Sequence, residues 1–425
     1  MQKQGKALEG ERWLRWGEGM GAIWLLVAVG LLATARFCVR PARTYRAWWV
    51  ALVATELGHV WVMVSLGVAG AAASFAEASE ARAGSIVTGL AAGLALAAAG
   101  LFARPGWSAW RMSGRVEAEL KAAFGGGARR EDVAEREKLW SWRRLWRWPN
   151  AGSRGAVETF AEEGAGGLPV DFYRARGRAG AERAVCVVVV HGGGWDSGDR
   201  SQLAAFNHWL AARGVAVAAV SYRLAPTHWW PAQRDDVRAA VAWVRANAER
   251  LGVDPDRLVL LGRSAGAQIA AATAYGEVLP GVRAVVALYG CHDLKFVWSI
   301  RSETDSLNSD KLMKQYLGGG PEGEGGPDLY RSGSAEKLAH AGAPPTLIVH
   351  GALDELVWCR HSERLAAALA RAGVPHVFVR MPWATHAGEA NLHGPAGQLI
   401  TGAVLRVARQ QATPAASQIK GEDSA

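Results

Sequence analysis

The stretch RLVLLGRSAG (Arg257–Gly266) decides the fold. Its first half is an apolar run that predicts a buried β-strand, and its second half matches the pattern G-x-S-x-G with Ser264 at the centre. A helical stretch follows, so the chain must turn sharply from strand to helix at the serine. Glycines on both sides relieve the crowding of such a turn, and the helix dipole favours negative charge at its N-terminus. We therefore predict that Ser264 is a catalytic nucleophile.

Strands and helices alternate on both sides of this turn. Helical patterns run from near Pro231 to Leu251 and from about Leu392 to Arg409. This alternation predicts an α/β fold with a mostly parallel sheet, helices on both faces and the active site at the carboxyl ends of the strands. The other predicted strands are VCVVVV (Val185–Val190), VAVAAVSY (Val215–Tyr222), AVVALYG (Ala284–Gly290), PTLIVHG (Pro345–Gly351) and HVFVRM (His376–Met381).

A serine hydroxyl becomes a good nucleophile only when a base takes its proton. Asp354, in HGALDELV, and His386, in MPWATHAG, follow the last two strands in the expected order of serine, acid, histidine. His386 would be the base, and Asp354 would orient it. Asp354 also suits a helix N-cap, and Asp293 is the alternative acid. His393 is the alternative base, although it falls within the last predicted helix.

The segment HGGGW (His191–Trp195) ends the first strong strand. Glycines let backbone N–H groups approach a developing oxyanion closely, so Gly193, Gly194 and the N–H group of Ala265 are the candidate oxyanion hole. His191 is expected to be structural. Several aromatic residues follow strand ends and are candidates for the substrate pocket or for the core, namely Trp195, Tyr222, Trp298 and Trp383.

Together with YRLAP (Tyr222–Pro226), these motifs resemble the hormone-sensitive-lipase-like branch of the α/β hydrolases over residues 156–411. The resemblance implies the α/β-hydrolase fold, an eight-stranded sheet and carboxylic ester hydrolysis without metal or organic cofactor. Many members of the branch carry an acidic residue before the serine, where this chain has Arg263. That residue and the stretch Leu317–Leu338 are more similar to the group of feruloyl- and acetyl-esterase-like and kynurenine-formamidase-like proteins.

The leading hypothesis is a serine carboxylesterase that acts through an acyl-enzyme intermediate on a small or medium acyl ester. An amide or formamide hydrolase would use the same residues, and a non-catalytic ligand-binding protein is a third hypothesis. The four cysteines form no C-x-x-C unit and show no metal-ligand spacing. This agrees with the resemblance, which implies a reaction without cofactor or metal.

Residues 1–104 are predicted to be a membrane region with about three transmembrane helices, at roughly 20–39, 48–74 and 84–103. The first also resembles a signal peptide that ends at Ala33–Ala35, but the two apolar segments after it favour an uncleaved anchor. Arginines in the first loop place the catalytic domain on the cytoplasmic side of this multi-pass arrangement.

Residues 105–155 read as a basic, Trp/Arg-rich juxtamembrane connector, and the net charge is +9. Interleaved tryptophan and arginine suit a membrane interface, although a surface helix with its tryptophans packed on the domain is an equal alternative. The same pattern could stack on single-stranded nucleic acid, but no nucleic-acid-binding fold accompanies it, so no nucleic-acid partner is expected. The α/β-hydrolase domain should span 156–411, followed by a disordered tail at 412–425.

Overall fold

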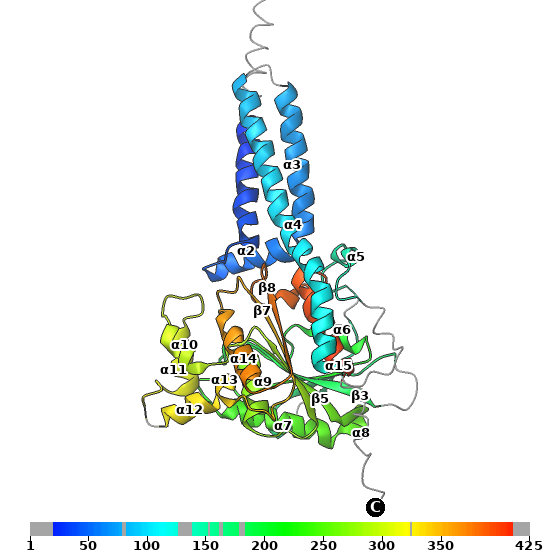
Figure 1. The fold of residues 1–425 in the computed structure, drawn as a ribbon, viewed down its shortest axis with the longest axis vertical. Coiled ribbons are helices and arrows are strands. Elements are labelled where there is room, and N and C mark those ends of the chain that lie inside the picture. Colours follow the sequence, from blue (N-terminus) through cyan, green and yellow to red (C-terminus); the bar gives the residue numbers. More distant parts are fainter. Residues whose placement is uncertain are drawn as a thin grey trace, which may run out of the picture.

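The computed structural model describes residues 20–78, 82–125, 138–151, 154–160, 165–177, 183–323 and 325–410. A stalk of long helices rises from an α/β domain, as Figure 1 shows. The α/β domain contains an eight-stranded sheet with the order β1-β2-β4-β3-β5-β6-β7-β8. Strands β1, β2 and β4 pair antiparallel and all other neighbours pair parallel, which confirms the predicted mostly parallel sheet. The strands are β1 (Glu158–Phe160), β2 (Val170–Tyr173), β3 (Ala184–Val190), β4 (Ala216–Val220), β5 (Val253–Arg263), β6 (Val282–Leu288), β7 (Thr346–Gly351) and β8 (His376–Met381).

The apolar strands are buried on both faces of the sheet. In β3, Cys186, Val188 and Val190 enter one hydrophobic core, whereas the residues between them enter the other, because side chains alternate along a strand. Helices α7, α9 and α14 cover the first face, and α4, α6 and α15 cover the second. The helices of the domain are α5 (Trp142–Leu145), η3 (Ala165–Gly167), α6 (Ala204–Ala211), α7 (Ala232–Ala246), α8 (Ala248–Leu251), α9 (Ala265–Gly276), α10 (Leu294–Ile300), α11 (Ser309–Leu317), α12 (Gly326–Ser332), α13 (Ala335–Leu338), α14 (Arg360–Arg371), η4 (Gly388–Ala390) and α15 (Pro395–Gln410).

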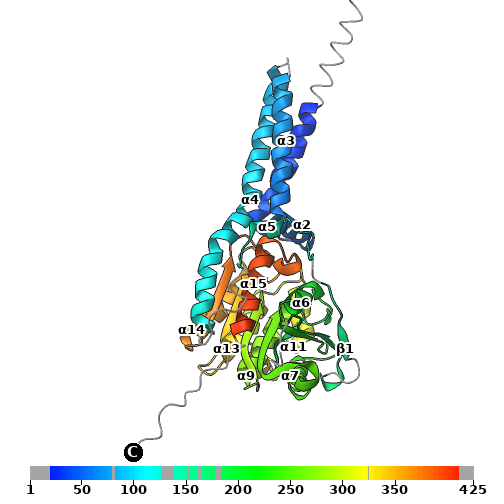
Figure 2. The same ribbon diagram turned by 90° about the vertical axis from the view of Figure 1, so that its right-hand side faces the viewer.

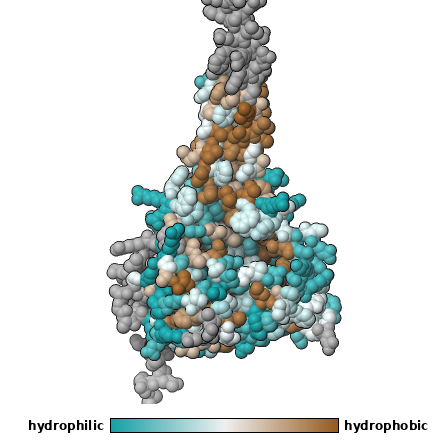
Figure 3. Space-filling model, turned by 180° about the vertical axis from the view of Figure 1, so that it is seen from behind, coloured by the Kyte–Doolittle hydropathy of each residue, from teal (hydrophilic) through white to brown (hydrophobic). Residues whose placement is uncertain are grey.

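The stalk consists of a helix at residues 20–35 and its continuation η1 (Arg36–Cys38), together with α3 (Gly58–Ala78) and the upper half of α4 (Arg82–Phe124). Within the described ranges, three helices are long and apolar enough to cross a membrane, namely Met20–Cys38, Gly58–Glu77 and Gly84–Phe124. Figure 2 shows them side by side, and in Figure 3 hydrophobic side chains cover much of the stalk surface.

The second predicted span, 48–74, is wrong at its start. The helix is interrupted at Leu57. The residues before this break form a separate helix, α2 (Tyr45–Glu56), which lies across the base of the stalk in Figure 1. A Cβ atom on Gly58 would lie only 2.4 Å from the carbonyl oxygen of Phe102, so the glycine allows α3 to approach α4 closely. The Glu56 carboxylate accepts a hydrogen bond of 3.1 Å from the N–H group of Ala396 in α15.

The predicted boundary between membrane region and connector, at 104/105, falls inside a continuous helix. The lower half of α4 packs into the same core as the sheet, because its apolar residues recur on one face: Ala109, Val116, Leu120 and Phe124. Glu117 of α4 also forms an ion pair with Arg406 of α15. Part of the predicted connector therefore belongs to the catalytic domain. Residues 126–137 and the predicted tail at 412–425 lie outside the described residues.

Candidate active site

Ser264 occupies the turn between β5 and α9. Its backbone has φ 51° and ψ −121°, a left-handed conformation that strains a non-glycine residue. A Cβ atom on Gly262 would lie 2.1 Å from the carbonyl oxygen of Gly266, and one on Gly266 would lie 2.2 Å from that of His191. Both glycines of the motif are thus required by close backbone approaches. The turn leaves the Ser264 side chain partly exposed at the start of α9.

The structure brings Asp354 and His386 together from the loops after β7 and β8. Nδ1 of His386 lies 2.6 Å from Oδ2 of Asp354, so this nitrogen donates to the carboxylate. The other carboxylate oxygen accepts hydrogen bonds from the N–H groups of Leu356 and Val357, at 2.9 and 3.0 Å. Asp354 therefore caps its own loop and orients the imidazole at the same time. Nε2 of His386 can then accept a proton.

A second histidine, His350, also contacts the Asp354 carboxylate. Its Nε2 lies 3.2 Å from Oδ2 of Asp354 and 2.8 Å from the carbonyl oxygen of Val357, and its Nδ1 lies 2.7 Å from Oγ of Ser362. Because a carbonyl only accepts, Nε2 carries the hydrogen. Burial raises the pKa of Asp354, but the nearby His386 and the hydrogen bonds from both histidines outweigh it and hold this pKa below its usual range. The carboxylate stays ionised.

The glycine loop after β3 faces the same turn. Gly193 has φ 123° and Gly194 has φ 59°, and a Cβ atom on Gly193 would lie 2.1 Å from the carbonyl oxygen of Ser197. Among the described residues, no protein oxygen accepts from the N–H groups of these glycines. Ala265 is the first residue of α9, so its N–H group has no carbonyl one turn earlier within the helix. These three donors are free for a ligand.

A buried ion pair connects the serine turn to the histidine loop. Nε of Arg263 lies 3.1 Å from Oε1 of Glu389, and both side chains are almost fully enclosed. The Tyr289 hydroxyl donates to the same carboxylate oxygen, and the Tyr289 ring packs against that of His386 with centroids 4.4 Å apart. The residue before Ser264 and the residue three after His386 are therefore tied together.

The alternative acid and base lie elsewhere. Asp293 caps α10 by accepting from the N–H group of Phe296 at 3.1 Å, and it pairs with Arg364. His393 comes just before α15 rather than within the last helix, and its Nε2 lies 3.3 Å from the carbonyl oxygen of Ala151. His191 stacks on Tyr222 with ring centroids 4.1 Å apart, an arrangement that fits a structural role. Among the described residues, no cluster of histidine, cysteine or acidic side chains could hold a metal ion.

Most of the aromatic pocket candidates pack in the interior. Trp383 is fully buried in the core on the α15 side of the sheet. The Trp195 indole N–H donates to Gln268 at 2.8 Å, and the Tyr222 hydroxyl donates to the carbonyl of His191 at 3.2 Å. Trp298 is partly exposed and lies under the Arg301 guanidinium. Of the four candidates, Trp298 is the one that is not buried.

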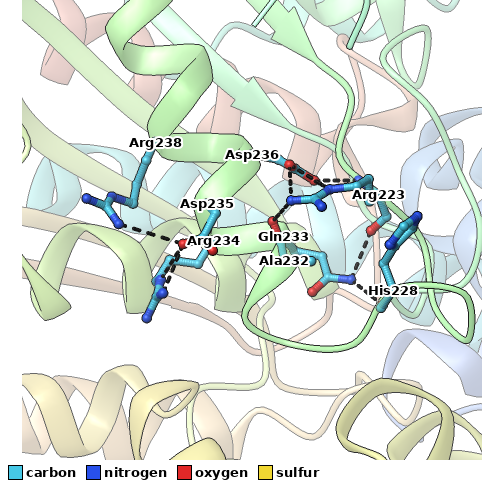
Figure 4. A network of polar contacts seen from close by, with 8 residues as sticks. All are labelled: Arg223, His228, Ala232, Gln233, Arg234, Asp235, Asp236 and Arg238. Atoms are coloured by element: carbon cyan, nitrogen blue, oxygen red, sulfur yellow. Dashed lines mark hydrogen bonds and ion pairs between the residues drawn. The ribbon is translucent and has the colours of Figure 1, made fainter. Parts of the chain in front are cut away.

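The YRLAP loop is anchored on α7, as Figure 4 shows. The Arg223 guanidinium pairs with Asp236 at 2.7 Å, and Gln233 donates to the carbonyl oxygens of Arg223 and His228 at 2.9 and 2.8 Å. A surface cavity of about 610 Å³ lies between this loop and α11. None of Ser264, Asp354 and His386 lines it, so it does not measure the acyl pocket.

Sequence reasoning missed His350, Glu389, Tyr289 and Trp48. The Trp48 indole N–H of α2 donates to the carbonyl oxygen of His386 at 3.1 Å, across 338 residues of sequence. His350 is the first residue of the HGALDELV segment, and a polar residue at the end of an apolar strand was the one available signal. The other contacts join segments that nothing local in the sequence relates.

Comparisons with known proteins agree with this fold. The family model described as BD-FAE matches residues 170–369. Esterase LipQ of Mycobacterium tuberculosis is 29% identical over 309 residues, which cover 66% of this chain and 70% of LipQ. Esterase LipC of the same organism is 29% identical and covers 48% of this chain, which in turn spans about half of LipC (53%). The solved structure of a bacterial heroin esterase is 25% identical, with a TM-score of 0.51, and covers 69% of this chain and 96% of that one. The chain thus has the α/β-hydrolase fold and is similar in sequence and in fold to esterases.

Proposed function

We propose that Ser264, His386 and Asp354 hydrolyse a carboxylic ester of small or medium acyl length through an acyl-enzyme intermediate. Nε2 of His386 takes the proton of the Ser264 hydroxyl, and the serine oxygen attacks the ester carbonyl. The N–H groups of Gly193, Gly194 and Ala265 stabilise the oxyanion. His386 then gives its proton to the leaving alcohol, and it activates the water that releases the acid.

The observation that carries this proposal is the 2.6 Å contact between His386 Nδ1 and Asp354 Oδ2. It fixes the tautomer that leaves Nε2 unprotonated and able to act as a base. The strained backbone of Ser264 and the free N–H donors beside it supply the remaining parts. The chemistry needs no group beyond those of the chain.

The test is the hydrolysis of a chain-length series of p-nitrophenyl esters by the full-length protein. The full chain is needed because α4 contributes buried residues to the catalytic domain. Ser264→Ala should abolish turnover, whereas Ser299→Ala, at an exposed serine of α10, should leave it unchanged. The chain-length optimum then reports the size of the acyl pocket. Folded wild-type protein that hydrolyses none of these esters would contradict the proposal.

Amide hydrolysis is the alternative because the same residues can attack an amide or formamide carbonyl. Matched ester and formamide substrates with one acyl group would separate the two activities. Failure of a fluorophosphonate probe to label Ser264 in folded protein would favour the third hypothesis, a non-catalytic ligand-binding protein.

We further propose that the three apolar helices span a membrane, with the catalytic domain on the cytoplasmic side. Each helix has the length and composition that a span needs. Exposed arginines gather where the stalk meets the catalytic domain, and positive charge favours the cytoplasmic side. Resistance to carbonate extraction would support the spans. Labelling of a cysteine placed on the catalytic domain from outside intact cells would contradict the orientation.

A further inference from the structure

Exposed arginine and aromatic side chains form a collar around the base of the stalk. They come from three segments that lie together: residues 36–49, residues 104–111 of α4 and residues 142–148. A Cβ atom on Gly106 of α4 would lie 3.4 Å from the ring of Trp142, and the rings of Trp146 and His59 have centroids 5.0 Å apart. The collar comprises Arg36, Arg40, Arg43, Arg46, Arg104, Arg111, Arg143, Arg147, Tyr45, Trp49, Trp107, Trp110, Trp142, Trp146 and Trp148.

The arginines of the collar have no close carboxylate partner in the part of the chain that the structure describes. Among the described residues, none of its arginines forms an ion pair with a carboxylate, and Arg43 has only a longer-range attraction to Glu355. Of the described acidic residues close to the collar in sequence, Glu56 is buried against α15 and Glu117 pairs with Arg406. One guanidinium group can donate two parallel hydrogen bonds to the oxygens of a phosphate. Tryptophan and tyrosine favour the headgroup layer of a membrane. The collar lies at the base of an apolar stalk, so anionic lipid headgroups fit it better than a nucleic acid does.

Helix α2 connects this collar to the candidate active site. Its outer side exposes Trp49, Val50 and Val53, so both of its sides are largely apolar. Its inner side holds Trp48, whose indole N–H binds the carbonyl oxygen of His386. Leu356, Ala387 and Ala390, from the loops that carry Asp354 and His386, pack in the same cluster as the buried residues of α2. Whatever holds α2 in place therefore also holds the histidine loop.

We propose that anionic lipid headgroups bind the collar and thereby hold α2 against the loop of His386. The inference rests on the membrane anchoring and ester hydrolysis proposed above. It predicts a protein that selects anionic over neutral lipid, and whose turnover rises when such lipid is present.

Lipid selection is tested on full-length protein in detergent with equal amounts of phosphatidylglycerol and phosphatidylcholine of the same acyl chains. The lipids that remain after repurification are quantified by mass spectrometry. The triple variant Arg40→Gln, Arg43→Gln, Arg46→Gln should lower the preference for phosphatidylglycerol by about a hundredfold, since each arginine near an anionic surface contributes about fivefold and the three factors multiply. The matched variant Arg250→Gln, Arg283→Gln, Arg371→Gln removes the same charge at exposed positions near the amino ends of the strands. It should leave the preference for phosphatidylglycerol unchanged. The proposal would be overturned if the wild type retained both lipids equally, or if both variants lost the lipid preference to the same extent. Tighter binding of single-stranded oligonucleotide than of lipid would also overturn it.

The link to the site is tested by the turnover of a short, soluble p-nitrophenyl ester in nanodiscs with and without phosphatidylglycerol. The wild type should be faster with the anionic lipid. Trp48→Phe removes the indole donor but keeps an aromatic ring, so it should retain lipid selection and lose most of the stimulation. Stimulation that persists in this variant, or that is absent from the wild type, would overturn the link. Absence of turnover in every lipid would instead contradict the proposed esterase function, and lipid retention would still decide the collar.

Discussion

Replacing Glu389 with glutamine should destabilise the protein by about 3–5 kcal/mol, because it leaves the buried Arg263 guanidinium without a countercharge. The wild-type pair is 3.1 Å apart, with side-chain exposures of 1% and 0%. Nη1 and Nη2 of Arg263 have no hydrogen-bond partner among the described residues, so Glu389 carries most of the compensation for this charge. Glutamine keeps the volume and removes only the charge.

A matched control pair exists on the surface. Nε of Arg380 also lies 3.1 Å from a carboxylate oxygen, that of Glu363, but these side chains are 50% and 45% exposed. Glu363→Gln should therefore cost about 0–1 kcal/mol. For a domain of this size about 1 kcal/mol shifts the unfolding midpoint by about 2–4 °C, so the expected shifts are about 6–20 °C for the buried site and under about 4 °C for the surface site.

The assay is thermal unfolding of the full-length variants, followed by intrinsic fluorescence in one detergent. The double variant Arg263→Met, Glu389→Leu should recover most of the lost stability, because apolar residues of similar volume need no countercharge. A Glu389→Gln midpoint no lower than that of Glu363→Gln would refute the reasoning. A double variant as unstable as the single one would show that lost packing, rather than the unpaired charge, causes the effect.

Further predictions concern pH, the support of Asp354 and the YRLAP loop. Burial raises the pKa of Glu56 from 4.5 to about 8. The folded state therefore takes up a proton, and stability falls by on the order of 5 kcal/mol as pH rises from about 4.5 to about 8. Glu56→Gln should flatten this decline in thermal scans at several pH values, and an unchanged decline would exclude Glu56 as its source. His350→Phe removes a donor to Asp354 and should lower kcat about tenfold, the kinetic equivalent of about 1.4 kcal/mol, whereas His350→Gln should restore part of it. Asp236→Asn should lower the unfolding midpoint by several degrees, since its partner Arg223 anchors the loop. The neighbouring Asp235→Asn should change the midpoint little, because the ion pairs of Asp235 are exposed. Equal shifts of the midpoint in both variants would contradict this prediction.

Local sequence predicted the parts of the fold that depend on local physics. The period of the apolar residues indicated the strands, and the glycines around Ser264 marked the turn, because only glycine fits where a Cβ atom would meet a backbone carbonyl 2.1–2.2 Å away. The order of Ser264, Asp354 and His386 along the chain pointed to residues from loops at one edge of the sheet. The structure places Asp354 against His386, and the roles of all three remain to be tested by substitution.

Contacts between distant segments were decided only by tertiary structure. Within the apolar residues 48–74, Glu56 and Gly58 alone do not specify a break, because the groups that they meet lie elsewhere, in the carbonyl of Phe102 and the N-terminus of α15. The same holds for Arg263 and Glu389, which are 126 residues apart. A buried charge is tolerated only when its partner is present, and sequence alone does not show which segments meet. The sequence by itself thus determined the α/β class and the identity of the candidate nucleophile. Only the tertiary structure decided that α2 and α4 pack onto the catalytic domain. This packing also connects the stalk to the histidine loop.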